Sequence, residues 1–546
     1  MTTIRRIYAY LLAFAGLAMV SVAAASLIQL LVDLVLQSSV VTTNDSVRNT
    51  VSFSTAAALV GLPVWLVHWL WIGRSVRTDA QERASPLRRL YLYAILAGAT
   101  LEMAGSVRDA LSSTFAWVVS PAAPGLSLDA VARPLPFVFI GLPVWLAHWR
   151  IADADRAAVG ERGGSATLRR WYLYGAAFVG LVLLLTGTQA VLDSLWRLVA
   201  QAGGSASPGL SHPAAEALVG LGLWFMHWAV LPTRLSAAAR SEEETTSVLR
   251  SVYLFAALTV AVLGCLLGLS QLLYYAVARG LGVERPGGVG GDLLQAASDP
   301  ASIAIVYGAV WAYQRQAVRQ QAATFAEAPR QAGVRRLYIY LVALVALGVM
   351  ASGVAGMLWT LGDLLFPASA VTTGDGGWRE EMALYATLTL VGLPAWLLHW
   401  RRRTSSATEA SSLARRVYVF LSLIVAMLAL VGSAAATLYQ LLGLALGASF
   451  SVATAADLMH ALAVASVAAT LAGYQWRVIR SDAHQLQAEP GEAHPELDPV
   501  VPPVRASIVV EIQAADSEAL ETAISALRAT GARVSVITQT APVSQP

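Results

Sequence analysis

The sequence contains no lysine, only one cysteine and few charged residues of either sign. Its 37 basic residues are therefore all arginine. The single cysteine, Cys265, excludes an intrachain disulfide framework and a metal cluster ligated by the cysteines of one chain. Charged residues make up 13% of the 546 residues and apolar residues 56%. This composition excludes a soluble protein of this size and predicts a membrane protein in contact with the lipid bilayer.

Motifs for nucleotide-dependent or hydrolytic chemistry are absent as well. No Walker-type phosphate loop, zinc-protease His-Glu motif, nucleophile elbow or Rossmann glycine fingerprint stands in a suitable context. This argues against an ATP-driven pump, and we expect no enzyme activity and no cofactor or metal. Nor does the net charge of +3 indicate a nucleic-acid partner, because the arginines line short connections instead of forming a patch.

A unit of about 80 residues recurs six times along the chain. Each copy opens with a basic residue followed by aromatic residues, as in Arg88-Arg89-Leu90-Tyr91-Leu92-Tyr93 and Arg335-Arg336-Leu337-Tyr338-Ile339-Tyr340. The first arginines of successive units lie 83, 81, 81, 85 and 80 residues apart. They are Arg5, Arg88, Arg169, Arg250, Arg335 and Arg415.

The units also end in a shared motif. Residues 61–69 read GLPVWLVHW, residues 141–149 GLPVWLAHW and residues 392–400 GLPAWLLHW. The third unit is looser and ends with Trp224-Phe225-Met226-His227-Trp228. The fourth and sixth units carry Gln314 and Gln475 in place of the histidine, so the units are not all equivalent.

Between its opening and its end, each unit has two apolar stretches separated by a short polar segment. Each stretch is long enough to cross a hydrocarbon core of about 30 Å as a helix. The sequence therefore predicts an all-α membrane protein of twelve transmembrane helices, arranged as parallel two-helix hairpins, and argues against inverted-repeat transporters. The six predicted hairpins are residues 1–80, 81–162, 163–243, 244–328, 329–408 and 409–480.

Arginines concentrate in the connections between units, for example Arg74, Arg77 and Arg83. The positive-inside rule places these connections, and both termini, in the cytoplasm of an inner (plasma) membrane. We then expect an aromatic belt at the cytoplasmic interface, formed by Tyr8, Tyr10, Trp65, Trp69 and their counterparts.

The C-terminal residues have a different character. Residues 481–504 are polar and rich in proline, which is typical of an extended linker. Residues 505–540 predict a small cytoplasmic β-α-β element. Two strands and one helix bury too little surface to be stable alone, so we expect this element to support a homo-oligomer or to bind a protein partner.

Glu102 is the sharpest candidate for a functional site. It lies about 16 Å of helix rise beyond Tyr91, which places it near the middle of the bilayer. Ionisable residues at that depth favour a role in proton or cation transport, although a neutral, hydrogen-bonded glutamate that joins two helices is the alternative. Arg108 and Asp109 follow on the same helix and are further candidates. Other polar residues toward the outer side could form a ring or simply lie near the headgroups: Gln29, Asp33, Gln189, Asp193, Gln271, Asp363 and Gln440.

Four histidines recur at the ends of units, namely His68, His148, His227 and His399. Neutral imidazole is a common ligand of metals and haem. However, each unit has only one such histidine, beside a tryptophan, with no second ligand at helical spacing. This pattern favours an interfacial anchor, or a hydrogen bond to the next unit, over a ligand role.

The opening Arg89-Leu90-Tyr91-Leu92-Tyr93, its counterpart Arg336-Leu337-Tyr338-Ile339-Tyr340 and the ending of residues 392–400 resemble a bacterial membrane-domain family of unknown function. In that family the unit is often repeated in tandem. The resemblance extends over about residues 1–480, and it implies architecture and location but no activity or site residues.

Three hypotheses for function follow. In the first, the chain is a transporter or channel-like protein whose six hairpins surround a central pathway that Glu102 faces. In the second, it is a noncatalytic scaffold or sensor that signals through its C-terminal tail. A haem- or chlorin-binding subunit for electron transfer is the third and weakest hypothesis.

Overall fold

The computed structural model describes residues 3–36, 44–119, 128–160, 163–200, 208–234, 247–288, 293–324, 329–367, 377–400, 407–488 and Ser525. The chain divides into two compact units, Met1–Glu489 and Pro490–Pro546. Within the described residues the secondary structure is helical, and no strand occurs. The β-α-β element predicted for residues 505–540 lies outside the described residues, except for Ser525.

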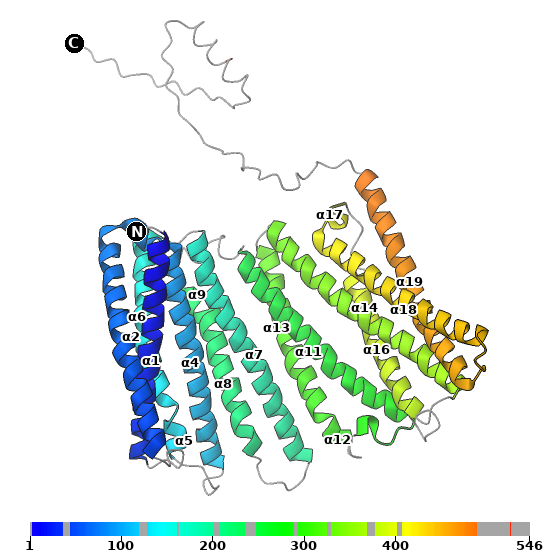
Figure 1. Ribbon diagram of the computed structural model, residues 1–546, viewed down its shortest axis with the longest axis horizontal. Coiled ribbons are helices and arrows are strands. Elements are labelled where there is room, and N and C mark those ends of the chain that lie inside the picture. The colour runs from blue at the N-terminus through cyan, green and yellow to red at the C-terminus, as the bar shows by residue number, and fades with distance from the viewer. Residues whose placement is uncertain are drawn as a thin grey trace. The chain divides into compact units, whose positions relative to one another are not determined.

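Six helical hairpins, numbered 1 to 6 in chain order, make up the first unit (Figure 1). The helix pairs are α1 (Thr3–Val35) with α2 (Asn44–Thr78), α4 (Pro86–Val119) with α6 (Leu135–Val159), α7 (Gly164–Ala200) with α8 (Ser211–Phe225), α11 (Val248–Gly280) with α13 (Ser298–Thr324), α14 (Pro329–Leu365) with α16 (Gly377–Trp400), and α18 (Leu413–Ala445) with α19 (Val452–Ala488). Short helices occur in the connections and loops: α3 (Ala80–Arg83), α5 (Leu128–Ala132), η1 (Pro208–Leu210), η4 (Pro286–Gly288), α12 (Leu293–Ala296) and α17 (Ala407–Ala410).

Eleven helical segments of the described chain are long and apolar enough to cross a membrane, one fewer than the twelve predicted. The missing segment is in hairpin 3, where α8 ends at Phe225 and a π-helical turn, η2 (Met226–Val230), leads into α9 (Leu231–Arg234). In this turn the backbone N–H of Leu231 bonds to the carbonyl oxygen of Met226. The next residue, Pro232, lies inside α9.

Glycines of the repeated ending allow the two helices of a hairpin to touch. A Cβ atom on Gly220 would lie 2.3 Å from the backbone nitrogen of Leu184, and one on Gly392 would lie 2.6 Å from the backbone nitrogen of Met350. A Cβ on Gly61 would lie 2.8 Å from the Cβ of Met19. The glycine that opens this motif is thus required for close helix approach, as in other membrane helix pairs.

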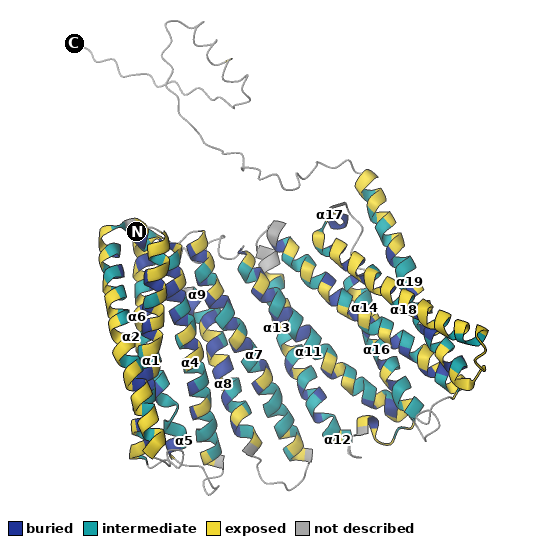
Figure 2. Ribbon diagram, viewed as in Figure 1, coloured by how far each residue is buried: buried dark blue, intermediate teal, exposed yellow. Residues whose placement is uncertain are grey.

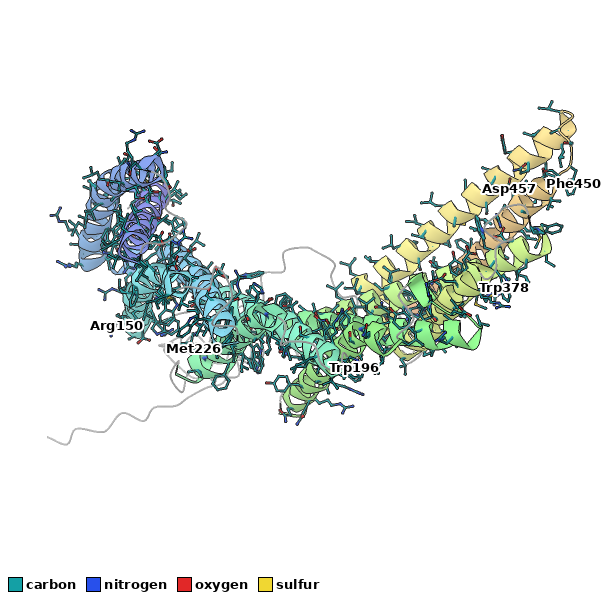
Figure 3. The ribbon with its side chains drawn as sticks, turned by 90° about the horizontal axis from the view of Figure 1, so that it is seen from below. Arg150, Trp196, Met226, Trp378, Phe450 and Asp457 are labelled. Carbon is teal, nitrogen blue, oxygen red and sulfur yellow. The ribbon has the colours of Figure 1, made fainter. Side chains whose placement is uncertain are left out.

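Consecutive hairpins lie side by side in chain order. The first helices α1, α4, α7, α11, α14 and α18 each contact the next in this series, and each of the first five also contacts the second helix of the following hairpin. Hairpins 1 and 6 therefore lie at the two ends of a row (Figure 1), and Figure 3 shows the same order from below. The hypothesis that the hairpins surround a central pathway is wrong for the described part of one chain.

Large apolar side chains remain exposed along the helices of this row, as Figure 2 shows. On α18, for example, Leu428 and Val431 are exposed. Such surfaces are compatible with contact to a lipid bilayer. At the C-terminal end of the row, α19 continues to Ala488, past the predicted start of the linker at residue 481.

Candidate functional site

The aromatic residues of the repeated motifs meet at the joints, a term we use for the contacts between one hairpin and the next. At the joint of hairpins 2 and 3, the indole nitrogen of Trp145 donates to the hydroxyl of Tyr172 over 2.9 Å. Within hairpin 3, the same Tyr172 hydroxyl lies 3.0 Å from Nε2 of His227, so this histidine bonds to its own hairpin and not to the next unit. Because Nδ1 of His227 donates to the Leu223 carbonyl, Nε2 of the neutral ring is an acceptor and Tyr172 is its donor.

Related contacts occur at other joints. Trp224 donates to Tyr253 between hairpins 3 and 4, and Trp396 donates to Tyr418 between hairpins 5 and 6, both over 2.9 Å. The histidine position of hairpins 4 and 6 is filled by Gln314 and Gln475, which are fully buried. A tryptophan of one hairpin thus bonds to a tyrosine of the next.

This packing takes some tyrosines out of the expected aromatic belt. Tyr10, Tyr91 and Tyr172 are at most 5% exposed and lie inside joints, whereas Tyr8 is 53% exposed. The tyrosine rings also contact each other across the joints: the centroids of Tyr10 and Tyr91 are 5.6 Å apart.

The four candidate histidines stay in their separate hairpins. His148 and His227 are buried, and each uses Nδ1 for a backbone carbonyl and Nε2 for a tyrosine, which leaves neither ring nitrogen for a haem iron. His68 contacts the ring of Tyr8, and His399 contacts that of Tyr338. Nowhere in the described residues do three or more His, Cys, Asp or Glu side chains group in a way that could hold a metal.

Substituting His227 tests this arrangement. His227→Leu removes the acceptor of Tyr172 and the donor to the Leu223 carbonyl, and we expect a loss of stability of about 1 kcal/mol. His227→Gln should cost less, because glutamine occupies this position in hairpins 4 and 6. Thermal unfolding of both variants in the same detergent measures the difference. Equal destabilisation would contradict a hydrogen-bonding role.

A buried ionic network also ties hairpin 1 to hairpin 2 at the connection. Arg6 on α1 pairs with Glu82 on α3 over 2.7 Å, and the hydroxyl of Tyr10 donates to the other Glu82 oxygen over 3.0 Å. Arg88, at the start of α4, donates to Asp155 near the end of α6 over 2.6 Å. Both side chains of the Arg88–Asp155 pair are only 6% exposed.

Hairpins 5 and 6 repeat this network. Arg336 and Tyr340 bind Glu409 on α17 over 3.0 and 2.9 Å. Arg415 binds Asp482 through two hydrogen bonds of 2.8 and 2.9 Å. The separation of arginine and aspartate is 67 residues in both copies.

Sequence reasoning missed the acidic members of these networks. The signal that could have found them is a glutamate six residues before the first arginine of a unit, present as Glu82, Glu244 and Glu409. Charged residues in short connections are usually solvated, so this regularity was easy to overlook.

Several of the outer polar residues also pair across joints. Asp33 pairs with Arg133 over 2.9 Å, Gln189 donates to Asp299 over 2.6 Å, and Asp363 binds His460 over 2.8 Å. Each contact joins the first helix of one hairpin to the second half of the next. Gln271 and Gln440 instead bond within their own hairpins. Because the hairpins lie in a row, these side chains form ties between neighbours and not a ring.

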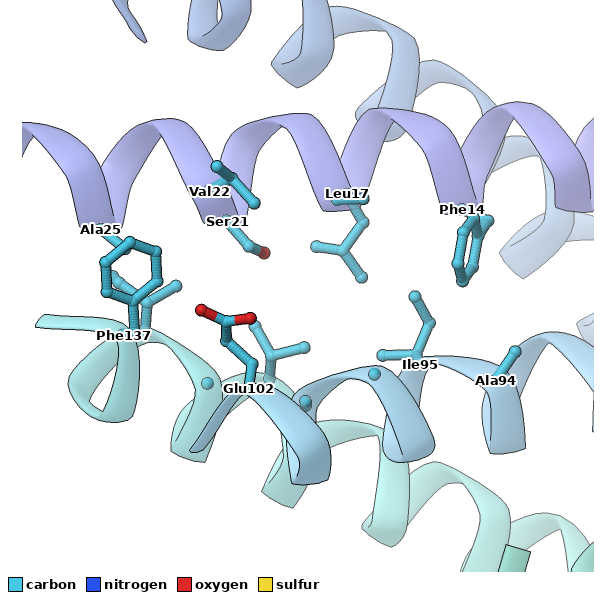
Figure 4. Close-up of a pocket in the computed structure, with 15 residues that line it drawn as sticks. Phe14, Leu17, Ser21, Val22, Ala25, Ala94, Ile95, Glu102 and Phe137 are labelled. Carbon is cyan, nitrogen blue, oxygen red and sulfur yellow. The ribbon is translucent and has the colours of Figure 1, made fainter. Parts of the chain in front are cut away.

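Glu102 lies apart from these contacts, at a cavity of about 160 Å³ bounded by α1, α4 and α6 (Figure 4). Its side chain is exposed at the rim. Glu102 forms no hydrogen bond or ion pair with any residue that the structure describes. The other two candidates on α4, Arg108 and Asp109, pair with each other over 2.9 Å, and neither lines the cavity.

The fold and the contacts at the joints show the class of protein: within the described residues it is all-helical, built of tandem hairpins, with many membrane-compatible helices. The chain belongs to the family described as "Domain of unknown function (DUF5671)", which matches it in four tandem segments, residues 6–129, 116–215, 196–310 and 336–470. No curated protein and no solved structure matches the chain. Each matched segment extends from one hairpin into the next.

Proposed function

We propose that this chain is a noncatalytic scaffold in a bacterial inner membrane, with twelve crossings, cytoplasmic termini and a tail that supports a homo-oligomer or binds a protein partner. The observation that carries this proposal is that polar contacts at the ends of the helices tie neighbouring hairpins into an open row. Ion pairs at the first and last joints, Arg6–Glu82 and Arg336–Glu409, hold the first helix of one hairpin to the connection that leads into the next, and such contacts are suited to fixing an architecture.

Transport, the competing hypothesis, finds less support. The described hairpins enclose no pathway, and the cavity beside Glu102 is confined to α1, α4 and α6. A transport route would need polar access through the thickness of the bilayer.

Flux through proteoliposomes separates the two functions. A scaffold predicts that proton and potassium leak equals that of protein-free vesicles, and that Glu102→Gln changes nothing. Protein-dependent flux that disappears in Glu102→Gln would overturn the scaffold proposal in favour of transport.

The twelfth crossing is proposed for residues 211–234, where α8, η2 and α9 follow one another without a break. Single cysteines placed in a Cys265→Ser background test it. We expect a membrane-impermeant maleimide to label a cysteine at position 451, between α18 and α19, in intact cells, and one at position 78, at the end of α2, only in opened cells.

The two positions discriminate because they are separated by nine crossings if residues 211–234 span the membrane, and by eight if they do not. Labelling of both cysteines from the same side would therefore rule out the twelfth crossing. Labelling of position 78 alone in intact cells would reverse the proposed orientation.

A further inference from the structure

Glu102 is the one carboxylate without a polar partner in the candidate membrane spans of the described chain. The others are paired: Asp33 with Arg133, Asp363 with His460 and Asp457 with Gln440, for example. An isolated charged carboxylate is expensive in an apolar environment, so it must take up a proton or bind a cation.

The cavity beside Glu102 is built almost wholly from apolar and small residues. Of the fifteen residues that line it, only Ser21 and Glu102 carry polar side-chain atoms. Figure 4 shows the carboxylate of Glu102 directed toward Ser21 on α1, with Phe137 of α6 beside it. Small side chains leave the space open, and a Cβ atom on Gly98 would meet nothing within 4 Å.

The size of the cavity limits what it can hold. Apolar protein cavities of about 150 Å³ bind a molecule the size of benzene and otherwise stay dry. The volume here, about 160 Å³, matches that scale. Because Glu102 is exposed at the rim, a ligand from the hydrocarbon phase can insert its apolar part into the cavity first. Its charged group then stays at the rim, beside Glu102.

We propose that this cavity binds a small hydrophobic organic cation, with a body about as large as one aromatic ring and an ammonium group that pairs with Glu102. The ring fills the apolar space between α1, α4 and α6, and the ammonium group also lies within reach of the Ser21 side of the cavity. The proposal rests on the transmembrane placement of these helices and not on the scaffold role.

Equilibrium binding of benzylammonium to the full chain in lipid nanodiscs tests the proposal. We expect saturable binding at one site per chain, weakened at least tenfold in Glu102→Gln, which removes the charge, and in Gly98→Leu, which fills the cavity. Gly105→Leu is the matched control. Gly105 lies on α4 as Gly98 does, a Cβ atom on it would meet nothing within 4 Å, and it does not line the cavity. It should bind as the unaltered chain does.

Three results would overturn the proposal: no saturable binding by the unaltered chain, equal binding by Glu102→Gln, or tighter binding of benzyl alcohol than of benzylammonium. The last would mean that Glu102 is protonated and acts as a hydrogen-bond donor. Flux measurements in vesicles do not enter this test, so failure of the cation site leaves the scaffold proposal standing.

Discussion

Replacing Asp155 with alanine is expected to lower the free energy of unfolding by about 3 to 5 kcal/mol, because it leaves a buried arginine without its counter-charge. Arg88 and Asp155 are each 6% exposed, and their 2.6 Å contact joins the two helices of hairpin 2 at the connection to hairpin 1. Arg83 also lies 3.6 Å from the same carboxylate. The purified chain is unfolded in mixed micelles by adding increasing amounts of a denaturing detergent. The free energy of unfolding of each variant, obtained from this titration, measures the loss.

The double variant Arg88→Met/Asp155→Leu separates the charge from the packing. Since no buried charge is left unpaired, we expect it to recover most of the stability that Asp155→Ala loses. Asp45→Ala is the surface control: its pair with Arg48 is largely exposed, and its loss should fall within the error of the measurement. A double variant as unstable as the single one would mean that the ion pair itself is indispensable.

Gly220→Val should disrupt hairpin 3. Even a methyl group at this position would lie 2.3 Å from the backbone nitrogen of Leu184, and backbone atoms cannot move aside as a flexible side chain can. The helices α7 and α8 must then separate, with a cost of about 1 to 3 kcal/mol or more from overpacking. We expect a smaller folded fraction of Gly220→Val in size-exclusion chromatography and a lower Tm than for the unaltered chain.

Gly222→Val provides the matched control within the same motif. A Cβ atom on Gly222 meets nothing within 4 Å, and the substitution has the same chemistry in the same helix. We expect Gly222→Val to retain the Tm of the unaltered chain. If both variants lost stability equally, helix propensity and not close packing of α7 and α8 would explain the effect.

Much of the architecture could be read from the sequence because its signals are local. The length of each apolar stretch, the polar segment between the stretches and the recurring arginine define a helical hairpin without reference to any other part of the chain. The exception in the helix count is α8, which ends at Phe225, where the π-helical turn Met226–Val230 begins.

The candidate site was only partly predictable. Glu102 was found because a carboxylate in a long apolar stretch is conspicuous, but its cavity depends on Gly98 and Gly141 of α4 and α6 and on Ser21 of α1. The histidines were found from their repetition. Their partners were not, since Tyr172 and His227 are 55 residues apart.

The sequence by itself determined six hairpins and the positions of the repeated arginines, tyrosines, tryptophans and histidines. Only the tertiary structure decided that the hairpins form a row, that Arg88 meets Asp155 and that Glu102 stands alone. The physical reason is that these helices are apolar on nearly every side. A helix that is hydrophobic all round carries no amphipathic pattern to say which face contacts a neighbour and which faces lipid.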